Sequence, residues 1–440
     1  MSARSIATLA RRMPGPATLH SRWKSPLRGP WLTSVFGVVL LVGIPIEFIT
    51  GLVSWAAYDP RLAGNDTTPQ HGILSFYLFN WVTSPSWLYR VSQGTHVLLG
   101  LALVPVLLAK LWSVIPRLFA WPPLRSLANL LERVSLLLLV GGAVFEFATG
   151  ILNIDYDYSF KFSFYNGHFY GAWAFIAGFT LHAALKFGRM RRALRSRRFR
   201  TELTIGLAGT LPEAPIPGLD DPPEGSLVAA HPAPATISRR GVLALVGGGS
   251  LAVFLATAGQ SIRLLRPLSL LSPRTQSYGS GPNAFQVNRT APAAGIAASD
   301  TGPGWKLELV GPTGTTAQLT RADLMSMTLV TAELPIACVE GWSTVQRWTG
   351  VRLADLARLV GIARPTGAHV QSLERRGAFN QASLSGQQVR AGEALLALRV
   401  NGADLSPDHG YPARVIVPAA PGVHNTKWVT RITFTGKEVG

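Results

Sequence analysis

Residues 32–57 read LTSVFGVVLLVGIPIEFITGLVSWAA, an apolar run interrupted by a single acidic residue. Three further apolar runs occupy residues 91–114, 134–154 and 168–187, and a fifth occupies residues 241–260. At about 1.5 Å per residue, a helix of this length crosses about 30 Å of hydrocarbon. The sequence therefore predicts an α-helical membrane bundle of four spans, with a fifth span as an anchor.

The composition agrees with a protein that lies partly in lipid. Hydrophobic residues make up 48% of the 440 residues, which is high for a soluble protein. The formal charge is +18, but the basic residues gather at the ends of apolar runs instead of forming one stripe with aromatic residues between them. We therefore expect membrane lipid as a partner and no nucleic acid.

The charges between the runs predict an orientation. Residues 1–31 contain six basic residues and no acidic one (Arg4, Arg11, Arg12, Arg22, Lys24 and Arg28). The positive-inside rule assigns such a segment to the cytoplasm. The connections with Asp59 and Asp66, and with Asp155 and Asp157, then fall outside. Five spans place everything after about residue 261 outside, which predicts a multi-pass plasma-membrane protein with an extracytoplasmic C-terminal domain.

The remainder of the chain divides by composition. Residues 201–237 are rich in proline and read as a cytoplasmic linker. Ser238-Arg239-Arg240 before the fifth run resembles a twin-arginine export signal, and ordinary positive-inside flanking is the alternative. Short β-branched runs and a helical piece at 353–360 predict a soluble α+β domain at the end. The expected domains are 1–31, 32–200 (membrane bundle), 201–237, 238–260 (anchor helix), 261–296 (extracytoplasmic linker) and 297–440.

An internal repeat suggests a haem site. Residues 47–52 read EFITGL and residues 146–151 read EFATGI, and the next span after each begins with a histidine, His96 or His168. The two histidines should lie at similar depth near the outer face. Two neutral imidazoles from opposed helices are what a b-type haem needs as axial ligands. The alternative for either residue is a hydrogen-bonded core histidine or a surface residue that flanks the span.

Other polar residues in the spans leave alternatives open. His182 follows His168 by 14 residues, about 21 Å along one helix face, and is an alternative haem ligand. A second, inner haem would need His20 or another ligand. Glu47 and Glu146 could accept protons from a quinol, because carboxylates inside a membrane are costly and often functional. A protonated glutamate bonded to a neighbouring helix is the other reading of each.

The only cysteine of the chain is Cys338. With a single cysteine, the chain cannot form an intrachain disulfide or a cysteine-ligated iron-sulfur cluster. Cys338 lies in LPIACVEGWS (334–343), followed by RWTGV (347–351); further on come NG (401–402), DHGYPARVIVP (408–418) and KWV (427–429). These stretches resemble the sulfite oxidase family, particularly its bacterial branch that includes molybdenum-dependent methionine sulfoxide reductases.

The resemblance implies a molybdenum-molybdopterin cofactor with the Cys338 thiolate as metal ligand. A soft thiolate suits such a metal. It also implies a set of residues close to the cofactor or its phosphate. These are His409, Arg414 and Lys427, with Arg347 after the cysteine motif and Asn288 and Arg289 in a similar upstream segment.

Two departures from the family's pattern bear on the substrate. Leu398 stands where sulfite oxidases carry an active-site tyrosine, and the arginine that follows the cysteine in sulfite-oxidising members is missing from 338–343. Our hypothesis is a redox enzyme that links a small oxyanion or sulfoxide substrate to membrane quinone through the haem. The alternatives are a sulfite-type dehydrogenase and a haem-binding membrane scaffold with a non-catalytic, partner-binding domain.

Overall fold

The structure is a computed structural model of the full chain. It describes residues 23–65, 79–118, 127–154, 164–214, 216, 226–229, 231–272, 274, 279–377 and 380–438. His20, Asp66, Asp155 and Asp157 lie outside these residues. The chain divides into two compact units, and each is described by itself: residues 1–48 with 99–255, and residues 49–98 with 256–440.

Each expected membrane span lies within a helix or extends at most two residues beyond its C-terminal end. The long helices are α3 (Pro30–Tyr58), α4 (Leu88–Leu118), α5 (Leu127–Asn153), α6 (Phe164–Ser196) and α8 (Arg239–Ala258). Within the described residues, four segments are long and apolar enough to cross a membrane: Pro30–Tyr58, Leu88–Pro116, Val134–Asn153 and Arg239–Ala258. Three of these segments belong to the expected four-span bundle, and Arg239–Ala258 is the expected anchor helix.

Helix α6 is the exception. It is 33 residues long, but it is not among the four apolar segments. Two histidines, two glycines, a tyrosine and a lysine lower the mean hydropathy of 168–187. Polar side chains that face the interior of a membrane bundle lower the mean hydropathy of a spanning helix in this way. The expected span over 168–187 therefore stays a prediction.

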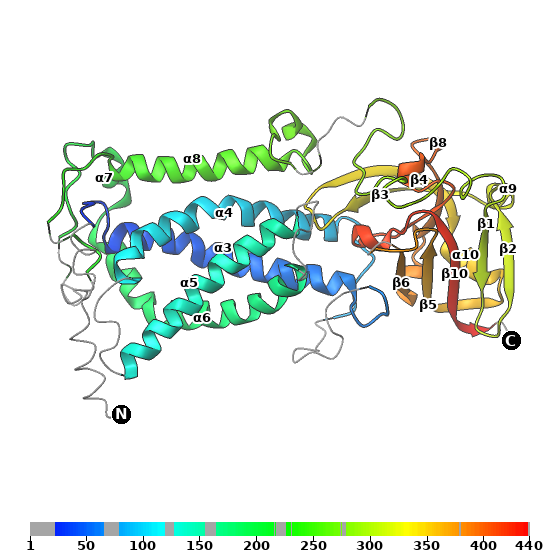
Figure 1. The fold of residues 1–440 in the computed structure, drawn as a ribbon, viewed down its shortest axis with the longest axis horizontal. Coiled ribbons are helices and arrows are strands. Elements are labelled where there is room, and N and C mark those ends of the chain that lie inside the picture. The colour runs from blue at the N-terminus through cyan, green and yellow to red at the C-terminus, as the bar shows by residue number, and fades with distance from the viewer. Residues whose placement is uncertain are drawn as a thin grey trace. The chain divides into compact units, whose positions relative to one another are not determined.

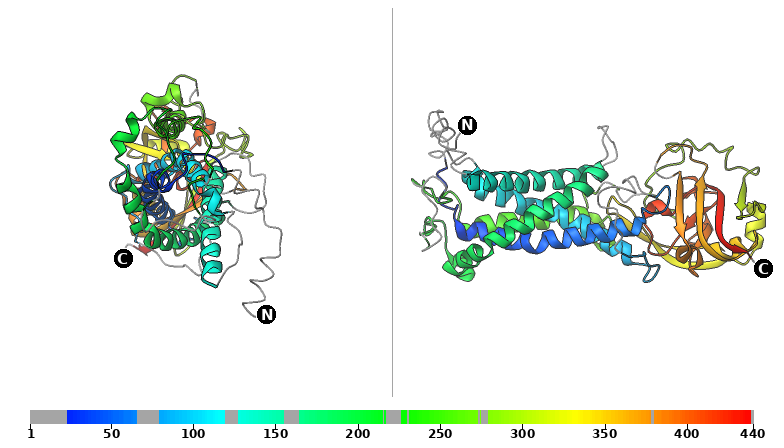
Figure 2. Two further views of the ribbon diagram at one scale, coloured as in Figure 1. Left: turned by 90° about the vertical axis from the view of Figure 1, so that its left-hand side faces the viewer. Right: turned by 90° about the horizontal axis from the view of Figure 1, so that it is seen from below.

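In the first unit, α5 and α6 run side by side (Figures 1 and 2). A Cβ added to Gly142 of α5 would stand 3.3 Å from the Phe175 ring of α6, so glycine permits the close approach. The first part of the expected 201–237 linker is folded, contrary to our prediction. Helix α7 (Phe199–Thr204) opens this region, and buried Glu213 accepts hydrogen bonds from the backbone N–H groups of Trp31 and Leu32 at the start of α3. An N-terminal cap of this kind satisfies helix donors that have no partner within the helix.

The expected anchor motif is also folded into this unit. The Arg239 guanidinium is buried, donates to the carbonyl oxygen of Leu211 at 2.5 Å and forms an ion pair with Glu202 at 3.5 Å. Arg197 pairs with the same carboxylate at 2.6 Å. These polar contacts hold the start of the 201–237 segment against α8, whereas its proline content had suggested an open linker.

The C-terminal part of the second unit contains two five-stranded sheets (Figure 1). The first has the order β2-β1-β10-β5-β6, with β10 parallel to β1 and antiparallel to β5. In the second, β3-β4-β7-β8 form a path and β9 pairs with β7. The strands are β1 (Lys306–Val310), β2 (Thr316–Thr320), β3 (Val330–Ala337), β4 (Ser343–Arg352), β5 (Ile362–Ser372), β6 (Gln381–Ser385), β7 (Leu395–Val400), β8 (Ala403–Asp404), β9 (Arg414–Ile416) and β10 (Val429–Glu438).

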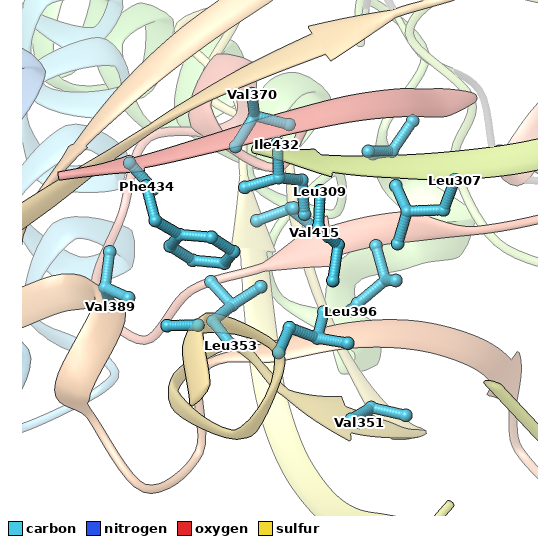
Figure 3. Packing of buried hydrophobic residues seen from close by; sticks show 14 of the residues in the cluster. Leu307, Leu309, Val351, Leu353, Val370, Val389, Leu396, Val415, Ile432 and Phe434 are labelled. Atoms are coloured by element: carbon cyan, nitrogen blue, oxygen red, sulfur yellow. The ribbon is translucent and has the colours of Figure 1, made fainter. Parts of the chain in front are cut away.

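Short helices complete this part. They are α9 (Arg321–Ser326), α10 (Leu353–Arg358), α11 (Gly386–Arg390) and the 3-10 turns η2 (Arg263–Leu268), η3 (Pro407–His409) and η4 (Gly422–His424). The sequence-based prediction of an α+β domain with a helix near 353–360 is confirmed. The core joins both sheets and α10: Figure 3 shows Phe434 of β10 beside Leu353, and Val415 of β9 beside Leu309. Alternating burial along β6 is typical of a strand with one buried face.

Candidate functional site

The Cys338 loop connects β3 to β4. The backbone N–H of Cys338 donates to the Trp342 carbonyl at 3.0 Å, and the N–H of Gly341 donates to the Cys338 carbonyl at 3.0 Å. Gly341 has a φ of 86°, which glycine adopts without steric cost. The thiol is buried, and burial raises its pKa, with Glu340 as a smaller cause. A bound metal cation reverses this preference, because a coordinating thiol loses its proton.

The thiol opens into a cavity of about 320 Å³. This volume includes space that is open to solvent. Five of the residues implied by the family resemblance line it, namely Cys338, Asn288, His409, Arg414 and Lys427. Phe285, Gln286, Val287, Ile336, Trp342 and Gly422 complete the lining.

Arg414 is a buried cation in the lining of the same cavity. Its guanidinium donates to the carbonyl oxygens of His409 at 3.1 Å and Asn425 at 3.0 Å. Within the part of the chain that the structure describes, no carboxylate pairs with it and its Nε lacks a hydrogen-bond partner. Burial lowers the pKa of Arg414 to about 9. A buried charge of this kind is costly unless an anion compensates it.

Lys427 adds a second buried ammonium group to the same cavity. Its Nζ donates to the carbonyl oxygens of Arg289 at 2.5 Å and Asp408 at 3.0 Å. Burial lowers the pKa of Lys427 well below its usual value, and Arg414 lowers it further. The cavity thus offers a thiol and two buried cations. These donors fit a molybdenum-pterin group, which needs a thiolate for the metal and cations for a phosphate.

His409 lies in the cavity as a neutral, fixed ring. Its Nε2 is 2.9 Å from the carbonyl oxygen of Asn283, and its ring stacks on Phe285 with centroids 3.7 Å apart. Burial lowers the pKa of His409 to about 3, and the charge of Arg414 adds to the effect. The ring is therefore a hydrogen-bonding group here and carries no charge near neutral pH.

Two residues that the resemblance implied lie outside the cavity lining. Arg289 pairs with Glu374 at 3.2 Å and reaches the site only through its carbonyl oxygen, which accepts from Lys427. Arg347 is exposed on β4, opposite Glu333 of β3. Arg347 does not line the cavity, so the geometry does not support the expectation that it lies near the cofactor.

Sequence reasoning missed the groups that brace the Cys338 loop. Arg274 donates to Glu340 through Nε and Nη2, both at 2.9 Å, and Nη2 also donates to the Asn288 carbonyl at 2.8 Å. Trp342 Nε1 donates to Glu340 at 2.6 Å. Glu340 and Trp342 could have been singled out, because they stand inside the cysteine motif. Arg274 lies in a segment that we expected to be a linker, and no local signal marks it.

The two proposed haem ligands have matching surroundings. In the second unit, Thr50 Oγ1 of α3 lies 3.2 Å from His96 Nδ1 of α4. In the first unit, Thr149 Oγ1 of α5 lies 3.2 Å from His168 Nδ1 of α6. A histidine that binds a metal typically engages its other ring nitrogen with a hydrogen-bond partner. Engagement of Nδ1 leaves Nε2 as the nitrogen that suits iron in both residues.

The glycine after each threonine makes the same close approach. A Cβ added to Gly51 would stand 3.1 Å from Cε1 of His96, and one added to Gly150 would stand 3.2 Å from Cε1 of His168. The sequence repeat is thus also a repeat of side-chain geometry. One difference is that His168 Nδ1 also lies 3.2 Å from the Glu146 carboxylate. His182 is partly buried on α6 and has no counterpart in this repeat.

The part of the chain that resembles known proteins contains most of the cavity lining. Residues 294–440 match the family described as oxidoreductase molybdopterin binding domain. A sulfite oxidase of Arabidopsis thaliana is 36% identical over 105 residues, which is 21% of this chain and 27% of that protein. The uncharacterized oxidoreductase YuiH of Bacillus subtilis is 30% identical over 132 residues, 30% of this chain and 65% of that protein.

A solved structure, the sulfane dehydrogenase SoxCD from Paracoccus pantotrophus, is similar with 23% identity and a TM-score of 0.28; the match covers 31% of this chain and 39% of that one. The chain spans less than two thirds of the length of each of these proteins. The family match, the cysteine motif and the cavity that contains it all fall in the same region. The C-terminal region of this chain, residues 294–440, is therefore an oxidoreductase molybdopterin-binding domain of the sulfite oxidase type.

Proposed function

We propose that this chain is a membrane-bound molybdenum oxidoreductase that moves electrons between a small extracytoplasmic substrate and membrane quinone through a b-type haem. The observation that carries the molybdenum part is the cavity, where one buried thiol and two buried cations converge. When bound, the molybdenum cofactor supplies two-electron oxygen-atom transfer.

The residues of the chain have distinct tasks in this proposal. The Cys338 sulfur would hold the metal, and Arg414 and Lys427 would hold the phosphate with charge-assisted hydrogen bonds. Neutral His409, fixed by its stack on Phe285, would line the pterin site without adding charge. Apolar Ile336 and Trp342 limit the entry of water around the sulfur. Low water content strengthens each of these electrostatic contacts.

The haem part of the proposal is supported by the matched threonine contacts of His96 and His168. A b-type haem supplies one-electron transfer. In this proposal, Glu47 and Glu146 of the repeat accept the quinol protons. His182 stays an alternative iron ligand, and membrane quinone stays a proposed partner. Plasma-membrane location with the C-terminal domain outside is proposed from the charge pattern.

A sulfoxide-type substrate is favoured over sulfite. A sulfite anion needs a cation beside the metal. Arg274 reaches the ligand loop, but Glu340 neutralises its charge in a two-point contact. Leu398, at the position of the family's tyrosine, is fully buried in the core of the domain and so cannot supply a hydroxyl or any other polar group. A neutral oxygen donor suits this loop better.

The test uses the full chain in detergent. Metal analysis and a pyridine haemochrome assay should find both molybdenum and haem in stoichiometric amounts. After reduction with a quinol analogue, addition of methionine sulfoxide should reoxidise the haem. Reduction of the oxidised haem by sulfite would instead support the sulfite-type dehydrogenase. Absence of molybdenum would support the haem-binding scaffold whose C-terminal domain only binds a partner.

A further inference from the structure

The three residues after Cys338 are held from outside the molybdopterin-binding domain. The Val339 carbonyl accepts from Gln93 Nε2 at 2.9 Å. The Glu340 carbonyl accepts from Gln260 Nε2 at 3.5 Å, and the Gly341 carbonyl accepts from Ser261 Oγ at 2.6 Å. All these residues belong to the second unit. Gln93 lies on α4, whereas Gln260 and Ser261 directly follow α8.

Gln93 is itself fixed before it reaches the loop. Its side chain is 4% exposed, and Ser54 Oγ of α3 donates to its Oε1 at 2.6 Å. With Oε1 held as an acceptor, the amide nitrogen must point at the Val339 carbonyl. Both partners come from helix segments, which position a side chain more rigidly than loops do.

Arg90 and Val97 extend the same contact along α4. Arg90 Nε donates to Ser343 Oγ at 3.0 Å, and its Nη2 donates to the Ser261 carbonyl at 3.3 Å. A Cβ added to Gly341 would stand 2.6 Å from Val97 Cγ1. The loop therefore packs against α4 so closely that only glycine is accommodated at position 341.

An apolar cluster supports the contact on the other side of the cysteine. Ala337 packs in one cluster with Tyr58 at the end of α3 and Tyr89 at the start of α4. Trp81 belongs to the same cluster, and its Nε1 donates to the Ala419 carbonyl at 2.7 Å. The residues before and after Cys338 are thus both held by the connection between the first two long helices.

We propose that the ends of α4 and α8 form part of the molybdenum site, and that Gln93 is a positioning residue for the Cys338 loop. The inference rests on the proposed function, in which Cys338 binds the metal. Without Gln93, Gln260 and Ser261, three consecutive carbonyl groups would lose their partners, and the loop would open more often. Gln93 precedes His96 by three residues, so one helical turn carries both this support and the proposed haem ligand.

The test uses the fact that Cys338 is the only cysteine of the chain, so thiol labelling reports this loop alone. The full-length protein is made in a host that lacks the molybdenum cofactor. In Gln93→Leu, iodoacetamide should label Cys338 about tenfold faster than in the wild type, because a buried carbonyl loses its donor and the open loop becomes more populated. Gln93→Glu should behave similarly, since a carboxylate accepts from Ser54 but cannot donate to Val339.

Ser92→Ala is the matched control, because Ser92 Oγ donates to the Thr50 carbonyl and does not contact the loop. Its labelling rate should equal that of the wild type. In a host that makes the cofactor, Gln93→Leu should retain haem and lose molybdenum. Wild-type labelling rates in both Gln93 variants would overturn the proposal. If Gln93→Leu fails to fold, Ser261→Ala replaces it, because Ser261 donates to the Gly341 carbonyl of the same loop. Labelling of Cys338 should then be faster in Ser261→Ala than in the wild type. Wild-type protein without molybdenum would refute the proposed function but leave the labelling comparison valid.

Discussion

The Glu340 carboxylate receives two hydrogen bonds from Arg274, each 2.9 Å long, two residues beyond the cysteine of the cavity. The side chains of both residues are largely buried, with exposed fractions of 13% and 7%. Arg274 also donates to the carbonyl oxygen of Asn288, which lines the cavity. One ion pair therefore joins the Cys338 loop to the segment that precedes the domain.

Arg274→Met should destabilise the protein by about 3 kcal/mol, because removing one partner leaves a buried carboxylate uncompensated. Thermal unfolding followed by tryptophan fluorescence measures the change. The control is Arg399→Met, which breaks an exposed pair with Asp404 and should cost about 0.5 kcal/mol. Equal shifts in the two variants would show that the Arg274 pair contributes no more than a surface contact.

Cys338→Ser should abolish molybdenum-dependent turnover and leave the haem absorption spectrum unchanged. A serine oxygen replaces the soft thiolate that the metal prefers. Substrate-dependent reoxidation of the haem measures the first property, and optical spectroscopy measures the second. Full turnover in this variant would refute the assignment of Cys338 as the metal ligand.

Arg414→Met should have opposite effects on stability and on cofactor content. In cofactor-free protein it should raise the unfolding temperature, because a buried charge without an anionic partner is removed. In protein made with the cofactor it should lower the molybdenum content about tenfold, since a charge-assisted phosphate contact is lost. Arg431→Met, in an exposed pair with Glu308, is the control and should change neither property. A lower unfolding temperature in the cofactor-free variant would contradict the proposed role.

Replacement of either His96 or His168 with alanine should eliminate the low-spin b-type absorption, and His182→Ala should leave most of it. The physical reason is the matched geometry, in which a threonine hydroxyl engages Nδ1 of His96 and of His168. Loss of half the haem in His182→Ala would indicate an inner haem, with His20 as the first candidate for its second ligand. Loss of all haem there, with none lost in His168→Ala, would identify the pair as His96 and His182.

We expect the C-terminal end to lie outside the cytoplasm, so an alkaline phosphatase fused after Gly440 should be active. An alkaline phosphatase fusion and a fluorescent protein fusion, compared in intact cells, give opposite readouts. The expectation follows from five spans and a basic N-terminal segment. Activity of a cytoplasmic reporter at this position would show that α6 does not span the membrane. The topology depends on α6, because it is the expected span that is less apolar than the others.

The sequence by itself determined the helices and the chemistry of the cavity. Apolar runs of sufficient length placed α3, α4, α5 and α8, since helix length in lipid follows from local hydropathy. The cysteine motif and the stretch 408–418 identified the molybdopterin-binding domain. The family resemblance also named five residues that line the cavity, namely Cys338, Asn288, His409, Arg414 and Lys427. Local patterns suffice where the chemistry depends on residue type and short-range spacing.

Only the tertiary structure decided which residues complete the site. Arg274 lies 66 residues before its partner Glu340, and Gln93 lies 246 residues before Val339, so no local pattern links them. Arg347, within a recognised motif, turned out to be exposed because alternate residues of a strand face opposite sides. The 201–214 segment, which its prolines marked as open, is folded because Glu213 finds unpaired helix donors at Trp31 and Leu32. Such contacts form between residues that are far apart in the sequence, and they depend on how the whole fold buries its side chains. A local sequence pattern therefore does not predict them.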